Sequence, residues 1–487
     1  MLFNSLEFLI FLPLVFLFYW YVLDKRLRLQ NLFVIIVSYI FYGWWDWRFL
    51  FLIIFTTGCS YFSGLAIKHY QNQGLNNIAK ICSTGNVIIN LAILGIFKYY
   101  NFFAESMQTL LQSLNFHLDY PTLNVILPVG ISFYTFQALS YSIDVYWNKI
   151  NPTKDALAFF AFVCFFPQLV AGPIERATNL LPQFQRNRTF DYSVAVDGCR
   201  QMLWGFFKKV VIADNCARYA NIAFGNYNEV GSMSLLLGAF FFTFQIYGDF
   251  SGYSSIAIGC AKLFGIKLQP NFRVPYFSRD IAEFWKRWHI SLNKWFVDYV
   301  YIPLGGSRVS KIKVIRNIFT IFLLSGLWHG ANWTYVVWGL YHACLFLPLI
   351  LLNKNHKYSG GFCEDKNFPS LHEAFNMLGT FLLVMIGWII FRATSLTQAL
   401  EYITKLCSFE KRTGEIGIAF VDSLWLIGII MVALLFEWWN RNADHEFKRI
   451  IPKPLVRNLV YFILIASIYV SYMMTIEDDT TFIYFQF

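Results

Sequence analysis

The sequence carries little charge for its length. Only 14% of its 487 residues are Asp, Glu, Lys or Arg, whereas 57% are hydrophobic and 20% are aromatic. An average soluble chain has about 25% charged residues. These proportions exclude a soluble multidomain protein and indicate a polytopic membrane protein.

Common catalytic and nucleotide-binding motifs are also missing. The sequence contains no G-x-S-x-G elbow, no H-E-x-x-H and no G-x-x-x-x-G-K-[ST], so serine hydrolases, zinc peptidases and P-loop enzymes have no support. The nine cysteines show no paired spacing, so we expect neither a disulfide framework nor a metal site. The net charge of +10 comes without a basic helix or an aromatic RNA-binding signature, so we expect no nucleic-acid partner.

Apolar segments fill most of the chain, and a membrane-crossing helix needs about 20 such residues. We predict an all-α polytopic protein with about 11–12 transmembrane helices. Loops rich in Lys and Arg alternate with loops that lack them, which places both termini outside the cytoplasm. The predicted spans are residues 7–23, 31–46, 48–67, 84–98, 122–143, 208–224, 233–262, 315–329, 333–352, 376–392, 421–438 and 458–475.

Residues 155–172 are apolar but are interrupted by Pro167 and end at Gly172. Basic residues follow this segment, and a full crossing would place all of them outside, in conflict with the cytoplasmic location of loop charges. A re-entrant segment that dips into the membrane and returns removes this conflict, and we expect its backbone to be broken. The basic residues are Arg176, Arg186, Arg188, Arg200, Lys208 and Lys209.

Residues 280–301 are predicted to form one amphipathic helix, because apolar residues fall on one stripe of a helical wheel and charged residues on the other side. His289 lies at the edge of this stripe. Pro303, Gly305 and Gly306 are expected to end the helix, since proline lacks the amide donor and glycine tolerates left-handed backbone. The apolar stripe consists of Ile281, Phe284, Trp285, Trp288, Leu292, Trp295, Phe296 and Tyr299.

Three of the eight histidines lie in or beside apolar segments. His329 ends a predicted span in a corner of small residues, where an ionisable group is costly and indicates function. His289 has two interpretations, a functional role or a contact at the edge of the amphipathic helix. His342 lies inside a span and is interpreted as a helix-packing residue bonded to a neighbour. The other histidines lie in polar loops and are predicted to be solvated: His69, His117, His356, His372 and His445.

Two polar islands interrupt apolar spans, one around Tyr134 and one around Gln245 and Asp249. A carboxylate at membrane depth must be paired or hydrated, so Asp249 is either in a structural salt bridge, with an arginine such as Arg287, or part of a site. A neutral imidazole, whose unperturbed pKa is about 6.5, can act as a general base toward a hydroxyl. If the other reactant is an activated thioester, no protein nucleophile is needed.

Five separated stretches resemble the successive signatures of the membrane-bound O-acyltransferase family and occur in the family's order. They are most similar to the bacterial branch that contains alginate O-acetyltransferase and the lipoteichoic-acid D-alanyl transfer protein. The resemblance covers about residues 1–475, with core motifs in 122–353, and implies a single membrane-embedded domain over 1–487. The stretches are LPVGISFYTFQALSYSIDVYW, FFPQLVAGPIER, QIYGDFSGYSSIAIG, FWKRWHISLNKWFVDYVYIPLGGSR and LSGLWHGANWTYVVWGLYH.

This resemblance implies a ring of membrane helices around a central tunnel. It places His329 at the position of the family's catalytic histidine and His289 at that of its second histidine. It implies acetyl-CoA or an acyl-carrier-protein thioester as donor, no permanently bound cofactor or metal, and a hydroxyl of an extracytoplasmic partner protein or polysaccharide as acceptor. The residues then expected to line the tunnel or contact substrate are Trp285, Trp288, Asn332, Asp249, Gln245 and Tyr134.

The basic cluster that includes Arg308 and Lys311 either holds donor phosphates or is ordinary cytoplasmic positive charge. We predict a protein of the bacterial cytoplasmic membrane that O-acetylates an exopolysaccharide or cell-envelope glycan such as alginate. Within the family, the alternative is D-alanyl or other acyl transfer from a carrier protein to teichoic acid. Outside it, the alternatives are a transporter or flippase of an acylated intermediate, which inverted repeats would favour although none is seen, and a scaffold of an export complex.

Overall fold

The computed structural model describes residues 1–116, 122–123, 127–169, 172–358, 368–409, 417–448, 453–475 and 482–483. Over these residues the chain consists of helices and loops, with no strand, which confirms the predicted all-α class. The chain divides into two compact units, residues 1–198 with 260–269 and residues 199–259 with 270–487. The single domain over residues 1–487 stays a prediction.

Seven helices in the described part of the chain are long and apolar enough to cross a membrane, so the chain is a polytopic membrane protein. Two shorter apolar helices, Leu6–Val22 and Leu27–Gly43, coincide with the first two predicted spans. The further crossings, the ring around a tunnel, the re-entrant path and the orientation stay predictions. The seven helices are Trp47–Asn72, Asn76–Ser113, Ser232–Leu263, Trp333–Leu351, Leu371–Arg392, Phe420–Trp439 and Pro454–Thr475.

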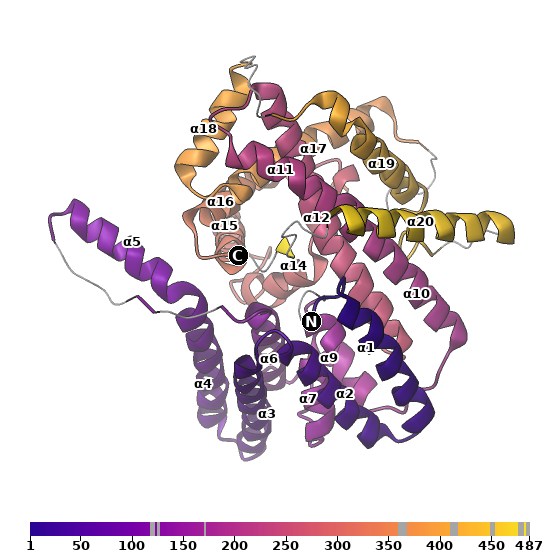
Figure 1. Cartoon of the computed structure of the whole chain (residues 1–487). Helices are drawn as coiled ribbons and strands as arrows, with labels where there is room; N and C mark the ends of the chain where they lie inside the picture. The colour runs from indigo at the N-terminus through magenta and orange to yellow at the C-terminus, as the bar shows by residue number, and fades with distance from the viewer. Residues whose placement is uncertain are drawn as a thin grey trace. The chain divides into compact units, whose positions relative to one another are not determined.

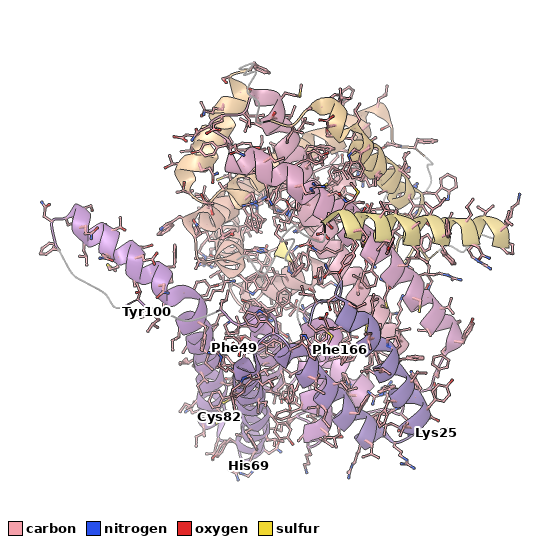
Figure 2. The ribbon with its side chains drawn as sticks, viewed as in Figure 1. Lys25, Phe49, His69, Cys82, Tyr100 and Phe166 are labelled. Atoms are coloured by element: carbon pink, nitrogen blue, oxygen red, sulfur yellow. The ribbon has the colours of Figure 1, made fainter. Side chains whose placement is uncertain are left out.

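The first unit contains helices α1 to α9. α4 runs into α5 through a π-helical turn, η3, at which the helix axis changes direction, so that α5 points away from α4 (Figure 1). Figure 2 places Tyr100 at this change of direction and His69 at the tip of α3, where the side chain is exposed as predicted. The elements are α1 (Leu6–Leu17), η1 (Phe18–Val22), α2 (Leu27–Gly43), η2 (Trp47–Phe49), α3 (Leu50–Asn72), α4 (Asn76–Leu94), η3 (Gly95–Tyr99), α5 (Tyr100–Ser113), α6 (Ile131–Tyr146), α7 (Ala156–Cys164), α8 (Phe166–Leu169) and α9 (Ala177–Phe184).

The predicted re-entrant segment has a broken backbone, as the sequence indicates. α7 ends because Phe165 leaves the helical backbone angles, at φ −51° and ψ 109°. The side-chain amide of Gln168, on α8, donates to the carbonyl oxygen of Phe162 at 2.7 Å and ties the two short helices together. Gly172 follows closely, since a Cβ at this position would overlap the backbone of Gln168.

Three of the basic residues that follow this segment lie inside the protein. Arg188 is 5% exposed, and its Nη2 donates to Asn31 Oδ1 at 2.6 Å. Lys208 and Lys209 are 2% and 1% exposed. The interpretation of these three as loop charges is therefore wrong. Because buried charges are held by specific partners, they do not indicate on which side of the membrane the segment lies.

The second unit contains most of the remaining helices, while α10 and α12 contribute residues to both units. The elements are α10 (Tyr192–Phe206), η4 (Phe207–Ala213), α11 (Asp214–Gly225), α12 (Ser232–Leu263), η5 (Pro275–Phe277), α13 (Ile281–Arg287), α14 (Ile290–Phe296), η6 (Val297–Tyr301), α15 (Lys311–His329), α16 (Trp333–Leu351), α17 (Leu371–Arg392), α18 (Leu396–Cys407), α19 (Phe420–Trp439) and α20 (Pro454–Thr475).

α15 and α16 pack side by side with their backbones in contact. A Cβ at Gly326, on α15, would overlap the carbonyl oxygen of Tyr335. A Cβ at Gly339, on α16, would overlap the carbonyl oxygen of Phe322. The two glycines therefore set the separation of these helices, and through it the position of His329 at the end of α15.

Residues 280–301 form two short helices and a π-helical turn, so the predicted single amphipathic helix is wrong in its continuity. The break lies at His289, which has left-handed backbone angles of φ 43° and ψ 54°. Such a conformation costs a residue other than glycine about 1–2 kcal/mol. The predicted apolar stripe is correct, since its members from Ile281 to Phe296 are buried. Gly305 and Gly306, with φ of 104° and 57°, follow the π-helical turn as predicted.

Candidate active site

The corner that presents His289 is closed by hydrogen bonds from both sides. The side-chain amide of Asn293 donates to the carbonyl oxygens of Trp285 at 2.7 Å and of Trp288 at 2.6 Å, and so joins the end of α13 to the start of α14. The backbone N–H of Ile290 donates to the carbonyl oxygen of Asn271 at 2.9 Å. A strained residue persists only where its surroundings determine it this firmly.

Buried ion pairs fix the first of the two short helices. Glu283 is buried on α13, and its Oε1 lies 3.0 Å from both Arg279 Nη2 and Arg287 Nη2. Arg279 also pairs with Glu373 at 3.2 Å, which ties α13 to the start of α17. Asp280 begins α13 by accepting the backbone N–H of Glu283 at 2.7 Å. α13 is therefore anchored by charge on the side that the sequence predicts to be its polar face.

His329 is the last residue of α15, and it is enclosed by aromatic rings. Its ring centroid lies 5.1 Å from that of Trp328, 5.2 Å from that of Trp338 and 5.4 Å from that of Phe391. The next residue, Gly330, allows the turn into α16, since a Cβ there would overlap the ring of Tyr335. The His329 side chain is therefore held among rings at the junction of α15, α16 and α17.

The two histidines singled out by the sequence lie together, with ring centroids 6.4 Å apart. Both are enclosed, at 1% exposure for His289 and 4% for His329. Phe250 packs against His289 at 4.7 Å, and Trp328 contacts both imidazoles. Burial lowers the pKa of His289, which lies outside the candidate membrane spans, to about 3. His289 is consequently neutral at pH 7.

His342 packs against Trp338, the ring that also contacts His329. Its ring centroid is 5.1 Å from that of Trp338 and 5.0 Å from that of Trp285. A Cβ at Gly387, on α17, would come within 2.8 Å of the His342 Nε2, so this glycine makes room for the imidazole. His342 thus occupies a packing position between helices, as the sequence indicates, but the predicted bond to a neighbour is wrong, since neither ring nitrogen has a hydrogen-bond partner among the described residues.

Asp249 forms the salt bridge expected of a buried carboxylate, but with a different partner from the one suggested. Its Oδ1 lies 2.7 Å from Lys209 Nζ, which also lies 2.7 Å from Asp214 Oδ1. Its Oδ2 accepts the backbone N–H of Ile483 at 2.6 Å. Arg287 pairs with Glu283 instead. A role for Asp249 in contacting substrate stays a prediction.

The remaining predicted site residues occupy different surroundings. Trp285 and Trp288 are buried in the aromatic cluster, where Trp285 packs on Trp338 at 5.6 Å and Trp288 on Trp388 at 4.8 Å. Asn332 caps α16, because its Oδ1 accepts the N–H of Thr334 at 3.0 Å.

Four further predicted residues differ in their burial. Gln245 is half-buried on α12, and Tyr134 is buried on α6 of the first unit. Arg308 and Lys311 are exposed, and Lys311 Nζ donates to the carbonyl oxygen of Leu351 at 2.8 Å. Their roles toward substrate stay predictions.

The histidines predicted to be solvated divide into two groups. His69, His356 and His372 are exposed, as expected, and His117 lies outside the described residues. His445 is 6% exposed, so the prediction is wrong for this residue. Polar composition of the loop around His445 suggested hydration, whereas the loop packs against its unit.

Sequence reasoning missed several residues of the site. Trp338 and Phe391 contact His329, yet each is one aromatic residue among many in the apolar spans, and such a residue does not by itself mark a site. Trp388 and Phe391 are three residues apart on α17, and this aromatic pair on one helix face was the available signal. Lys209 was detectable as one of two lysines inside an otherwise apolar run, FFKKVVIA.

The geometry suits proton transfer in a site that excludes water. Two enclosed imidazoles among aromatic rings can exchange a proton with a hydroxyl and hold it by a hydrogen bond. Among the described residues, no group of three His, Cys, Asp or Glu side chains could hold a metal ion. The ionisable side chains brought together at this centre are the imidazoles of His289 and His329.

Comparison with known proteins identifies the family. The profile of the MBOAT, membrane-bound O-acyltransferase family, matches residues 151–354, which include both histidines. A Pseudomonas putida protein named probable alginate O-acetylase AlgI is 36% identical over 100% of both chains. The chain belongs to the membrane-bound O-acyltransferase family. It is therefore an acyltransferase, as the resemblance of its motifs implies.

Two other relatives extend the comparison. A Helicobacter pylori protein named peptidoglycan O-acetyltransferase is 34% identical over 85% of this chain and 83% of its own length. A Bacillus subtilis protein named teichoic acid D-alanyltransferase is 31% identical, but over 49% of this chain and 63% of its own length. The similarity to proteins named as O-acetyltransferases thus extends over far more of this membrane-bound O-acyltransferase than the similarity to the D-alanyl transfer branch.

Proposed function

We propose that this acyltransferase moves an acetyl group from a cytosolic thioester, acetyl-CoA or an acyl carrier protein, to a hydroxyl of an extracytoplasmic acceptor. The acceptor is an exported polysaccharide such as alginate, another cell-envelope glycan, or a partner protein that passes the acetyl group on. The enzyme would reside in the bacterial cytoplasmic membrane with both termini outside. The observation that carries the proposal is the pairing of His289 and His329, 6.4 Å apart, inside an aromatic enclosure.

In the proposed reaction, His329 acts as general base. Its imidazole takes the proton of the acceptor hydroxyl as the oxygen attacks the thioester carbonyl carbon. The C–O bond forms, the C–S bond breaks, and the imidazolium returns the proton to the departing thiolate. His289, neutral because burial lowers its pKa to about 3, has one ring nitrogen to donate and one to accept a hydrogen bond, and so orients the acceptor without adding a second positive charge.

The donor phosphates have a proposed contact at Arg308 and Lys311. Both side chains are exposed after the glycine turn that follows η6. If they bind phosphate, Arg308→Gln combined with Lys311→Gln raises the KM for acetyl-CoA and leaves the KM for acetyl-pantetheine, which lacks phosphate, unchanged. Equal KM values in variant and wild type would assign the two residues to ordinary cytoplasmic charge.

D-alanyl transfer to teichoic acid is the second candidate. The teichoic acid D-alanyltransferase of Bacillus subtilis, which matches 49% of this chain, is the observation in its favour. Membranes that contain the protein should therefore be given either acetyl-CoA or a D-alanyl carrier protein, and polysaccharide, peptidoglycan and teichoic acid fractions counted separately. The fraction that gains label identifies the acceptor class.

The deciding experiment compares wild type with His329→Ala at matched expression, using radiolabelled acetyl-CoA. We expect incorporation to fall by about 10²–10⁴-fold, the range for loss of a general base. His356→Ala, which removes an exposed histidine, is the matched control and should incorporate at the wild-type level. Equal incorporation by His329→Ala would remove this residue from the chemistry and favour the transporter or the scaffold.

A further inference from the structure

The segment Phe482–Ile483, here called the strap, lies inside the second unit beside the His289 corner. Both of its residues are buried, at 0% and 1% exposure. The backbone N–H of Ile483 donates to Asp249 Oδ2 at 2.6 Å, and the ring centroid of Phe482 lies 4.1 Å from that of Tyr253. A directional hydrogen bond and a ring contact therefore fix the strap on α12.

The charge of its binding site explains why a backbone N–H is favourable there. Lys209 Nζ lies 2.7 Å from a carboxylate oxygen of both Asp214 and Asp249, so one ammonium group is shared by two buried carboxylates. The second oxygen of Asp249 faces Ile483. An N–H donated to an ionised carboxylate forms a charge-assisted bond, which is stronger than a bond between neutral groups. The strap thus supplies a donor that the lysine alone cannot.

From the strap, ring contacts lead to the site. The ring of Phe482 lies 6.4 Å from that of Phe250, between centroids, and the ring of Phe250 lies 4.7 Å from that of His289. Phe250 follows Asp249 on α12, so the strap holds two neighbouring residues of one helix turn. His289 needs such support, because its left-handed backbone is unfavourable by itself.

We propose that the strap is a positioning element of the acyl-transfer site. It holds Phe250 against His289 and thereby keeps the imidazole enclosed in its corner, facing His329. Its effect on the reaction rests on the proposed function. The enclosure of His289, however, can be measured without any acyl transfer.

The test measures the accessibility of His289 in full-length protein in membranes, by diethyl pyrocarbonate modification and peptide mass spectrometry. Ile483→Pro removes the N–H that binds Asp249, and Ile483→Val is the matched control that retains it. We expect modification of His289 to rise at least about fivefold in Ile483→Pro, because local opening exposes the ring, and to stay low in Ile483→Val. Unchanged modification of His289 in Ile483→Pro would overturn the proposal.

Modification of His342, which is fully buried against Trp338, indicates general unfolding in the same samples. If His342 also becomes reactive in Ile483→Pro, the comparison is made with Phe482→Leu, which retains apolar bulk but removes the ring contacts. In that variant we expect His289 to gain reactivity while His342 stays protected. Protection of both histidines in Phe482→Leu would count against the strap.

Acetyl transfer provides an independent measurement. We expect Ile483→Pro to lower kcat with little change in the KM for acetyl-CoA, and to cause no further loss in a His289→Ala background. A strap that merely stabilises the fold would lower activity in both backgrounds. If the wild type transfers no acetyl group, the proposed function fails, while the modification of His289 still decides the role of the strap.

Discussion

The side-chain amide of Asn293 donates to the carbonyl oxygen of Trp288 at 2.6 Å, across the interruption between α13 and α14 at which His289 lies. The same amide also reaches the carbonyl oxygen of Trp285 at 2.7 Å. One side chain therefore holds together two short helices that the backbone alone would leave free to move. The shape of the His289 corner depends on this amide.

Replacing Asn293 by Asp is expected to open the corner, because a carboxylate would face two carbonyl oxygens without a hydrogen to share. Loss of these bonds should cost about 1–3 kcal/mol of stability and lower acetyl transfer. Lys294→Gln, at the adjacent exposed position, is the control and should leave both quantities unchanged. Thermal unfolding in detergent and acetyl transfer in membranes are the measurements, and equal behaviour of the two variants would show that the amide does not hold the corner.

Gly339→Ala is expected to displace α16 from α15, because the new Cβ would overlap the carbonyl oxygen of Phe322. Overpacking of this kind costs about 1–3 kcal/mol, and it would also shift His329 at the end of α15. Gly379→Ala, on α17, adds the same methyl group where no atom lies within 4 Å and should be neutral. The measurements are the unfolding temperature and the acetyl transfer of the two variants. A Gly339→Ala protein as stable and active as Gly379→Ala would contradict the close helix contact.

Acid should destabilise the protein through His289. Burial lowers its pKa from 6.5 to about 3, so between these values the unfolded chain binds a proton that the folded chain does not. Above pH 6.5 the titration of His289 does not reduce the free energy of unfolding. As the pH falls from 6.5 toward 3, this free energy decreases by up to about 1.4 kcal/mol per pH unit.

Unfolding temperatures between pH 7.5 and 5 test this dependence. His289→Asn removes the titrating ring and tolerates the left-handed backbone, so its pH dependence should be flatter than that of the wild type. His356→Asn, which changes an exposed histidine, should follow the wild-type profile. Parallel profiles for all three proteins would show that His289 is not buried in its neutral form.

Helix positions and the two central histidines could be predicted from the sequence because both depend on local patterns. Runs of apolar residues set the spans, and an ionisable residue at the end of such a run marks His329. The break at His289 could not be predicted from a helical wheel. The apolar residues of 281–296 form one stripe on the wheel, which indicates a continuous helix and gives no sign of the left-handed residue. The break is stabilised by the bond that the Asn293 amide donates to Trp288 and by the bond that the Ile290 N–H donates to the carbonyl oxygen of Asn271, and the periodicity of the sequence indicates neither.

Ion-pair partners that are distant in the sequence could not be predicted either. The pairing of Asp249 with Lys209 joins α12 to η4, and composition alone offered Arg287 as an equally good cation. Lys209 was interpreted as loop charge because lysine is usually exposed, whereas two carboxylates bury it here. His445 was misjudged for the same reason. Burial of polar side chains depends on partners, and the partners become visible only in the fold.

The wall around His329 is completed by Phe391, near the end of α17. Because chains are synthesised and fold from the N-terminus onward, both imidazoles are in place along the chain before the helix that completes their enclosure is synthesised. In a nascent chain that ends before α17, His329 would lack the ring of Phe391 and would be more accessible to water. The protein therefore acquires its sealed centre late in biosynthesis, and an incompletely synthesised chain would lack the ring of Phe391 that completes the enclosure of His329.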